Sequence, residues 1–215
     1  METPEVTTQG STVEEWTRAL AQSTGSPGGG AGTGLMLAVA ASLTSMVAGY
    51  SEDDGGEPAR IRERARALRQ EALRLADDDA SASKAFGAAF RLEPGKERDE
   101  AIRRASLEAA ASSAVLGERA IGAIDDLEWL ATNGNRSLVA DVVVAFGALR
   151  AAVAGARTNV SFDLGSLRSA GSSLDQVREQ QPELWAAVKK LNGAMDRIDE
   201  LTAAIDHRAA PTDAA

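Results

Sequence analysis

The chain has 215 residues, enough for one substantial hydrophobic core and too few for two large domains. Its formal net charge is -9, and its Lys and Arg residues are interleaved with acids, so we expect neither a nucleic-acid nor a membrane partner. The sequence contains no cysteine, which excludes disulfides, thiolate catalysis and Cys-based zinc sites. The one histidine, His207, precedes a polar tail, and we expect it to be solvated and the protein to have no metal site.

Ala, Leu, Arg and Glu dominate the composition, and no segment shows the alternation of a half-buried strand. The sequence therefore predicts an all-α protein, a bundle of five to six helices. We expect a disordered N-terminus over 1–10, one helical domain over 11–207 and a disordered tail over 208–215. Residues 1–10 are polar and contain no apolar signal core, which favours a cytoplasmic protein.

The first helix is predicted to begin at Ser11, because Glu14 three residues later completes a capping-box pattern. A Gly- and Ser-rich loop over 22–30 follows, and then a helix over 31–49 that is apolar on every side. The uncharged stretch 32–50 approaches the length that crosses a bilayer, about 20 residues. Because it is rich in small residues and is followed by acids rather than Lys or Arg, a buried central helix is the better interpretation.

A third helix follows the acidic loop 51–58, and its inward face includes one carboxylate. Apolar residues recur at steps of three and four on this face, from Ile61 to Phe86, and Asp79 falls among them. A buried carboxylate tends to have a raised pKa and suits proton transfer, although a structural hydrogen bond explains it equally well. Asp77 and Asp78, considered alone, are typical of a solvated acidic patch.

Three more helices are predicted: a long one over 96–131, another over 137–167, and a final amphipathic one whose apolar stripe runs from Leu184 to Ile205. The helix over 137–167 has few charges and is expected to be largely interior. A small bundle has room for about one fully surrounded helix, so two such helices favour a homodimer in which a second copy covers the remaining face.

Polar residues at three further places are candidates for a site. Pro27 and the glycines Gly28, Gly29 and Gly30 precede a helix start, where free N–H groups suit an anionic or polar ligand, although a flexible turn is the simpler explanation. Asn135 and Asp141 belong to the segment that joins two helices. Asn135 is equally explained as an N-cap, and Asp141 as an acid in the first turn of the second helix. Asn159 and Asp163 lie four residues apart on one helical face.

These motifs, in this order, resemble the cyclodeaminase/cyclohydrolase family of folate one-carbon enzymes. The resemblance covers residues 11–205 and rests on ordered motifs: Pro27 to Ala31, Met46-Val47, Asp77 to Ala80, Gly134-Asn135 with Asp141, and Asn159 to Leu164. The chain departs from the family pattern at Ala31, Ser83, Arg136 and Asp163, where Ser, Phe, Pro and Asn are usual. An acidic stretch at 52–54 also replaces a basic one.

The resemblance implies a helical homodimer that binds a tetrahydrofolate derivative near the dimer interface, with no cofactor or metal. Asp79, Asp77 and Asp141 would be catalytic. Pro27, the three glycines, Asn135, Asn159 and Asp163 would bind substrate. The activity expected first is hydrolysis of 5,10-methenyltetrahydrofolate to 10-formyltetrahydrofolate. The alternatives are a formiminotetrahydrofolate cyclodeaminase that releases ammonia, and a non-catalytic folate-binding or interaction module of the same fold.

Overall fold

The computed structural model describes residues 6–23, 25–51, 56–167 and 172–209, with side chains described to residue 205. The stretch 52–54, the side chain of His207 and residues 210–215 of the predicted tail lie outside the described part. Within that part every regular element is helical, which confirms the predicted all-α class. The elements, in chain order, are α1 (Val13–Leu20), α2 (Gly29–Gly49), α3 (Glu57–Phe90), α4 (Lys96–Gly122), α5 (Ile124–Asn133), the 3₁₀ turn η1 (Arg136–Leu138), α6 (Val139–Ser166), α7 (Leu174–Gln180) and α8 (Pro182–Ala209).

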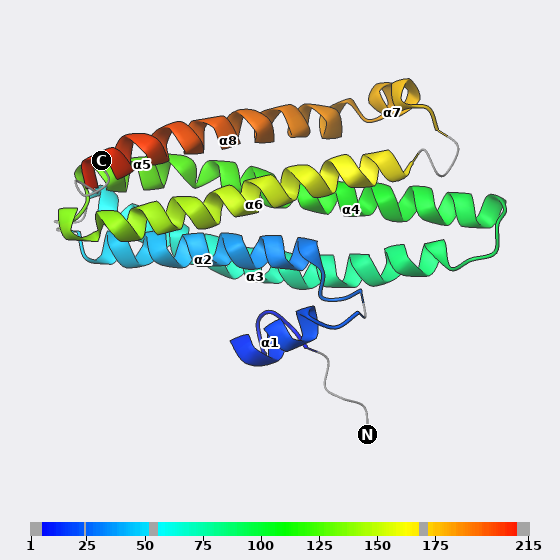
Figure 1. Cartoon of the computed structure of the whole chain (residues 1–215), viewed down its shortest axis with the longest axis horizontal. Helices are drawn as coiled ribbons and strands as arrows, with labels where there is room; N and C mark the ends of the chain where they lie inside the picture. Colours follow the sequence, from blue (N-terminus) through cyan, green and yellow to red (C-terminus); the bar gives the residue numbers. More distant parts are fainter. Residues whose placement is uncertain (1–5, 24, 52–55, 168–171, 210–215) are drawn as a thin grey trace.

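The long helices lie side by side, with α6 in the middle of the bundle (Figure 1). Helix α6 packs against α2, α4, α5 and α8, and α3 lies against α2 and α4. Phe146, Leu149, Val153 and Val160 on α6 are fully buried. Helix α6 therefore shares the centre of the bundle with α2, which corresponds to the predicted helix over 31–49.

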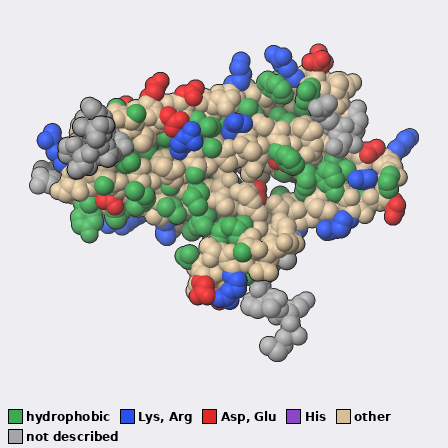
Figure 2. Space-filling view, viewed as in Figure 1, with side chains coloured by type: hydrophobic (Ala, Val, Ile, Leu, Met, Phe, Trp, Pro, Cys, Tyr) green, Lys and Arg blue, Asp and Glu red, His purple; other side chains and the backbone are tan. Residues whose placement is uncertain are grey.

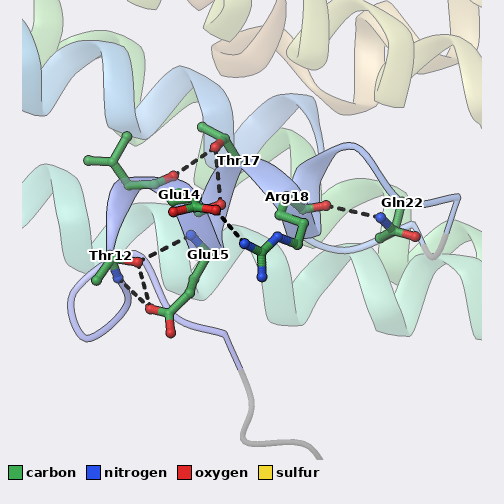
Figure 3. Close-up of polar contacts among 7 residues, drawn as sticks. Thr12, Glu14, Glu15, Thr17, Arg18 and Gln22 are labelled. Atoms are coloured by element: carbon green, nitrogen blue, oxygen red, sulfur yellow. Dashed lines mark hydrogen bonds and ion pairs between the residues drawn. The ribbon is translucent and has the colours of Figure 1, made fainter.

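Helix α1 and the segment before it pack against α3, below the main bundle (Figure 1). The N-cap is Thr12 and not Ser11: Thr12 and Glu15 form the capping box, one residue later than predicted (Figure 3). The Ser11 hydroxyl instead accepts a hydrogen bond from the Thr7 N–H. Trp16 is buried against Ala31 and Ala76, which anchors α1.

Helix α2 starts at Gly29, two residues before the predicted start, so two of the glycines belong to its first turn. It is not surrounded on all sides as predicted: Met36 and Val39 are each 39% exposed and Met46 is 37% exposed. On length and composition alone, α2 and residues 136–166 could each cross a bilayer. In this structure each of the two helices has one face exposed and buries the other face in the bundle.

The register of α3 follows the prediction closely. Ile61, Ala65, Ala72 and Leu75 are buried, and Asp79 is buried with them. Gly34 on α2 permits close packing against Ala76 on α3, since a methyl group at position 34 would come within 2.7 Å of the Ala76 Cβ. Close packing of α2 on α3 therefore fixes the inward face on which Asp79 lies.

The second half of the chain contains two breaks that the prediction missed. The helix predicted over 96–131 is interrupted at Ala123, which separates α4 from α5. Helix α7 was not predicted, although Ser173 and Gln176 form a capping box that marks its start. The predicted helix over 137–167 corresponds to η1 and α6.

Candidate active site

A hollow lies beyond the N-terminal end of α2, where its neighbours continue past it. Helix α3 meets the first turn of α2 at Gly30 and continues for about three turns, and α6 meets α2 at Thr33 and also continues for about three turns. Because α2 begins between these longer helices, it leaves space between them that the loop before it borders. Figure 2 shows an opening through the molecule in this region, with acidic atoms at its edge.

Asp79 reaches into this region from α3. Its side chain is only 9% exposed and lies directly against Gly30, so that an added methyl group on Gly30 would overlap the carboxylate. The N–H of Ala31, in the first turn of α2, donates a hydrogen bond to Asp79. The Ser83 hydroxyl, one turn along α3, donates a second, longer one at 3.5 Å. A carboxylate at a helix N-terminus is favoured by the free N–H groups and the helix dipole.

Asp163 enters the same region from α6 and is also 9% exposed. Gly155 fixes the approach of α6 to α2, because any side chain there would collide with Thr33. Asp163 lies two turns beyond Gly155, past the start of α2. None of the described residues donates a hydrogen bond to its carboxyl group.

The two carboxyl groups influence each other's ionisation. Burial raises the pKa of Asp163 to about 7, and the negative charge of Asp79 contributes to this rise. Burial also raises the pKa of Asp79, while the hydrogen bonds from Ala31 and Ser83 act in the opposite direction. Near neutral pH the pair can therefore hold one proton, which gives the site both a proton donor and a proton acceptor.

The three glycines differ in what they do. Gly28 is the N-cap of α2, and Gly29 faces open space. Only Gly30 makes a contact that forbids a side chain. Pro27, just before them, is half-buried, and the neighbouring Ser26 hydroxyl donates to the Ala80 carbonyl, which ties this loop to α3 beside Asp79.

Asp77, predicted to act with Asp79, points away from it. Its carboxylate accepts hydrogen bonds from the Thr8 N–H and from the Gln9 side-chain amide. Residues 6–10, assigned by the prediction to a disordered N-terminus, thus form a turn attached to α3. In this structure Asp77 anchors the N-terminal segment, and it makes no contact with the pair formed by Asp79 and Asp163.

Asn135 and Asp141 lie at the other end of α2. Asn135 caps η1 by accepting a hydrogen bond from the Ser137 N–H, and its side-chain amide donates to the Tyr50 carbonyl. Asp141 is half-buried in the first turn of α6. Since α2 has 21 residues, about 30 Å of helix separates this end from Gly30. Within one chain, these two residues and the acid pair do not form a single site.

Asn159 is half-buried one turn before Asp163 on α6, as the spacing predicts. Sequence reasoning missed Ser83, the second donor to Asp79, and Gly155, which sets the position of α6. Ser83 could have been found from its position four residues after Asp79 on a helix. Gly155 gives no such signal, because its role depends on Thr33 in another helix. Among the described residues, no cluster of three or more acids or histidines could hold a metal ion.

Comparison with known proteins assigns the chain to a class. The family model described as formiminotransferase-cyclodeaminase matches residues 12–183, so the chain belongs to this family. Its fold is similar to the crystal structure of formiminotetrahydrofolate cyclodeaminase from Thermotoga maritima, with a TM-score of 0.75 and 22% sequence identity. That match covers 92% of this chain and 96% of the other. No curated protein matches the chain.

Proposed function

We propose that this chain is an enzyme acting on the one-carbon unit of a tetrahydrofolate derivative, with hydrolysis of 5,10-methenyltetrahydrofolate as its first candidate reaction. The observation that carries the proposal is the buried Asp79 carboxylate, held against Gly30 at the start of α2 beside a second buried acid. Family membership supports the folate class of ligand.

The reactive carbon of methenyltetrahydrofolate belongs to a cationic amidinium. Two buried carboxyl groups with one proton between them would attract this cation and stabilise it where water is largely excluded. Water adds to the carbon and loses a proton, N5 gains a proton, the C–N5 bond breaks, and the hydroxyl group on the carbon loses its proton to give the neutral formyl group. Positioned acid and base groups typically accelerate such proton transfers by about 10²–10⁴-fold.

The second candidate is the cyclodeaminase reaction, favoured by the name of the structural neighbour and of the family. In that reaction N10 attacks the formimino carbon and ammonia leaves, which produces the methenyl compound. The two reactions pass through similar tetrahedral carbons and need the same proton carriers, so the same pair of acids would serve either one.

One absorbance assay tests both candidates. Methenyltetrahydrofolate absorbs strongly, so a cyclohydrolase accelerates the loss of its absorbance and a cyclodeaminase produces absorbance from formiminotetrahydrofolate. The rate without protein is subtracted in each case. If neither signal responds to the protein while a folate still binds in calorimetry, the chain is a binding module and the catalytic proposal is wrong.

We also propose that a second copy of the chain covers the exposed apolar face of α2 and α6. Figure 2 shows hydrophobic side chains gathered along this side of the molecule. Val144 and Phe162 on α6 are 58% and 65% exposed, and α2 contributes Met36, Val39 and Met46. Large exposed apolar patches are typical of interfaces. A two-fold axis near the middle of α2 would bring the Asn135 end of one copy toward the Asp79 end of the other.

A further inference from the structure

The two buried acids differ in their hydrogen-bond donors. Asp79 receives hydrogen bonds from the Ala31 N–H and the Ser83 hydroxyl, both of which stabilise its ionised form. Asp163 has no such donor within the described part of the chain, and only 9% of the residue is exposed. A buried carboxyl group without donors favours its protonated form.

Among the residues that the structure describes, no cation lowers the pKa of Asp163. Helix α2 has no ionisable side chain. On α3, Asp77 binds the N-terminal segment and Asp78 pairs with Arg74. On α4, Arg103 donates to the Ser172 hydroxyl. On α6, the half-buried Arg157 lies almost two turns before Asp163 and has a buried Nε without an acceptor. Lys84 on α3 and Glu108 on α4 are exposed.

These surroundings decide the order in which the two groups ionise. Asp79 loses its proton first, because the start of α2 stabilises its charge. Once Asp79 is charged, Asp163 holds its proton more tightly, since a second negative charge would be unpaired in the same buried region. At neutral pH the two acids therefore differ in protonation: Asp79 is ionised and Asp163 holds the proton.

We propose that Asp163 is the proton donor of this site and that Asp79 is the proton acceptor. The proposal rests on the proposed function and deepens it, because it gives each of the two buried acids a separate role in proton transfer. Asp163 would thus be a second catalytic residue beside Asp79.

The proton count is complete for ammonia release. The formimino group reacts in its protonated, cationic form. N10 forms a bond to the formimino carbon, the π electrons of the C=N bond become a lone pair on the formimino nitrogen, and Asp79 takes the N10 proton. Asp163 gives its proton to the formimino nitrogen, the bond from carbon to that nitrogen breaks, and ammonia leaves with the electron pair. The cationic methenyl product remains. The pair holds one proton before and after the reaction.

Hydrolysis uses the same groups with one difference. Asp79 takes a proton from the attacking water, and Asp163 protonates N5 as the C–N5 bond breaks. The hydroxyl proton of the tetrahedral intermediate then returns to the pair. One proton in excess leaves to solvent in each turnover, because the cationic substrate becomes a neutral formyl product.

The test compares the wild type with Asp163→Asn, which keeps the shape and removes the proton. We expect the turnover number of the wild type to fall as pH rises through about 7. In Asp163→Asn, turnover at the optimum falls by about 10²–10⁴-fold and this alkaline limb disappears. Asp175→Asn, on the exposed face of α7, is the matched control and should leave both unchanged. An Asp163→Asn variant that is within about threefold of wild type, changes only KM or keeps the limb overturns the proposal.

A second measurement separates this proposal from the proposed function. The infrared band of a protonated carboxyl group is recorded for both proteins below and above neutral pH. We expect a band in the wild type that weakens as pH rises through about 7 and is missing in Asp163→Asn. If no folate is turned over but this band is present, the proposed function is wrong, while the conclusion that Asp163 is protonated near neutral pH is still supported. If the band is absent, Asp163 is not the donor, whatever the activity.

Discussion

At the scale of single residues, Asp79 is where the sequence and the structure agree most closely. Its helical phase predicted an inward carboxylate, and the structure buries it against Gly30. Asp79→Asn keeps size and hydrogen-bond acceptance, so we expect turnover to fall by about 10²–10⁴-fold. The melting temperature should stay the same or rise, because burial raises the pKa of this group and so disfavours its charged form. An active variant with a clearly lowered melting temperature would assign Asp79 to architecture.

Asp163 predicts a pH dependence of stability. Its pKa is raised to about 7 in the folded protein. Between about pH 4 and pH 7 the folded state therefore keeps a proton on Asp163 that the unfolded chain has already lost. Its contribution is fully present below the unfolded pKa, about 4, and is lost as pH rises through about 7. Asp163→Asn should therefore melt at least a few degrees above wild type at pH 8 and close to it at pH 4 or below, by calorimetry at matched salt. A variant less stable at pH 8 contradicts the expected sign.

The glycines before α2 give a matched pair of variants. Gly30→Ala places a methyl group on the Asp79 carboxylate, and Gly29→Ala places one in open space. We expect Gly30→Ala to lower turnover at least tenfold, since misplacing a catalytic group by about 1 Å has effects of this size or larger. Gly29→Ala should behave as wild type. Equal activity of the two variants in the absorbance assay would show that Asp79 need not lie against Gly30.

At the scale of elements, Asp77 connects the N-terminal segment to α3. Removing its carboxylate in Asp77→Ala deletes the acceptor for the Thr8 N–H and the Gln9 amide. We expect this variant to lose protection of residues 6–20 in hydrogen exchange while the core helices keep theirs, because the bundle does not depend on this contact. Turnover should fall by less than about tenfold, well short of the loss expected for a proton carrier. A loss as large as that of Asp79→Asn would return Asp77 to the catalytic group.

The elements also show what sequence reasoning could reach. Hydrophobic periodicity located α3 and fixed the inward phase of Asp79, and a long apolar stretch with few charges located α6, because each signal lies within one helix. The break at Ala123 was missed, since the apolar spacing continues from α4 into α5 across it. The pairing of Asp79 with Asp163 was also missed. It depends on how far α3 and α6 extend past the start of α2, which follows from packing between helices rather than from any local pattern.

At the scale of the whole molecule, the predicted site residues fall at the two ends of α2. Asn135 and Asp141 lie near its C-terminal end, and Asp79 and Asp163 near its start. One chain cannot bring these ends together, because α2 holds them about 30 Å apart. Antiparallel packing of two copies through the apolar face of α2 and α6 would do so, and it would also remove that face from water.

This arrangement predicts a dimer that a single charge on the exposed face disrupts. Val39 lies in the middle of α2 and is 39% exposed, so Val39→Glu adds a charge to the face without entering the core. If two copies meet there, two such charges would be desolvated close together, and the dimer should dissociate at micromolar concentration. Light scattering should give about 45 kDa for the wild type, twice the 22.3 kDa of one chain, and about half that for the variant.

The control for this test is Ala186→Glu, an exposed position on α8 away from the α2 and α6 face, which should remain dimeric. Circular dichroism should show equal helix content in all three proteins, because neither substitution enters the core. The Val39→Glu monomer should also lose turnover if each site takes residues from both copies. Mixing it with a chain that carries Asp79→Asn should then restore activity, because one site of the mixed dimer combines an intact Asp79 with the Asn135 end of the other chain. A wild-type protein that is monomeric at this concentration contradicts both the dimer and a site built from its two ends.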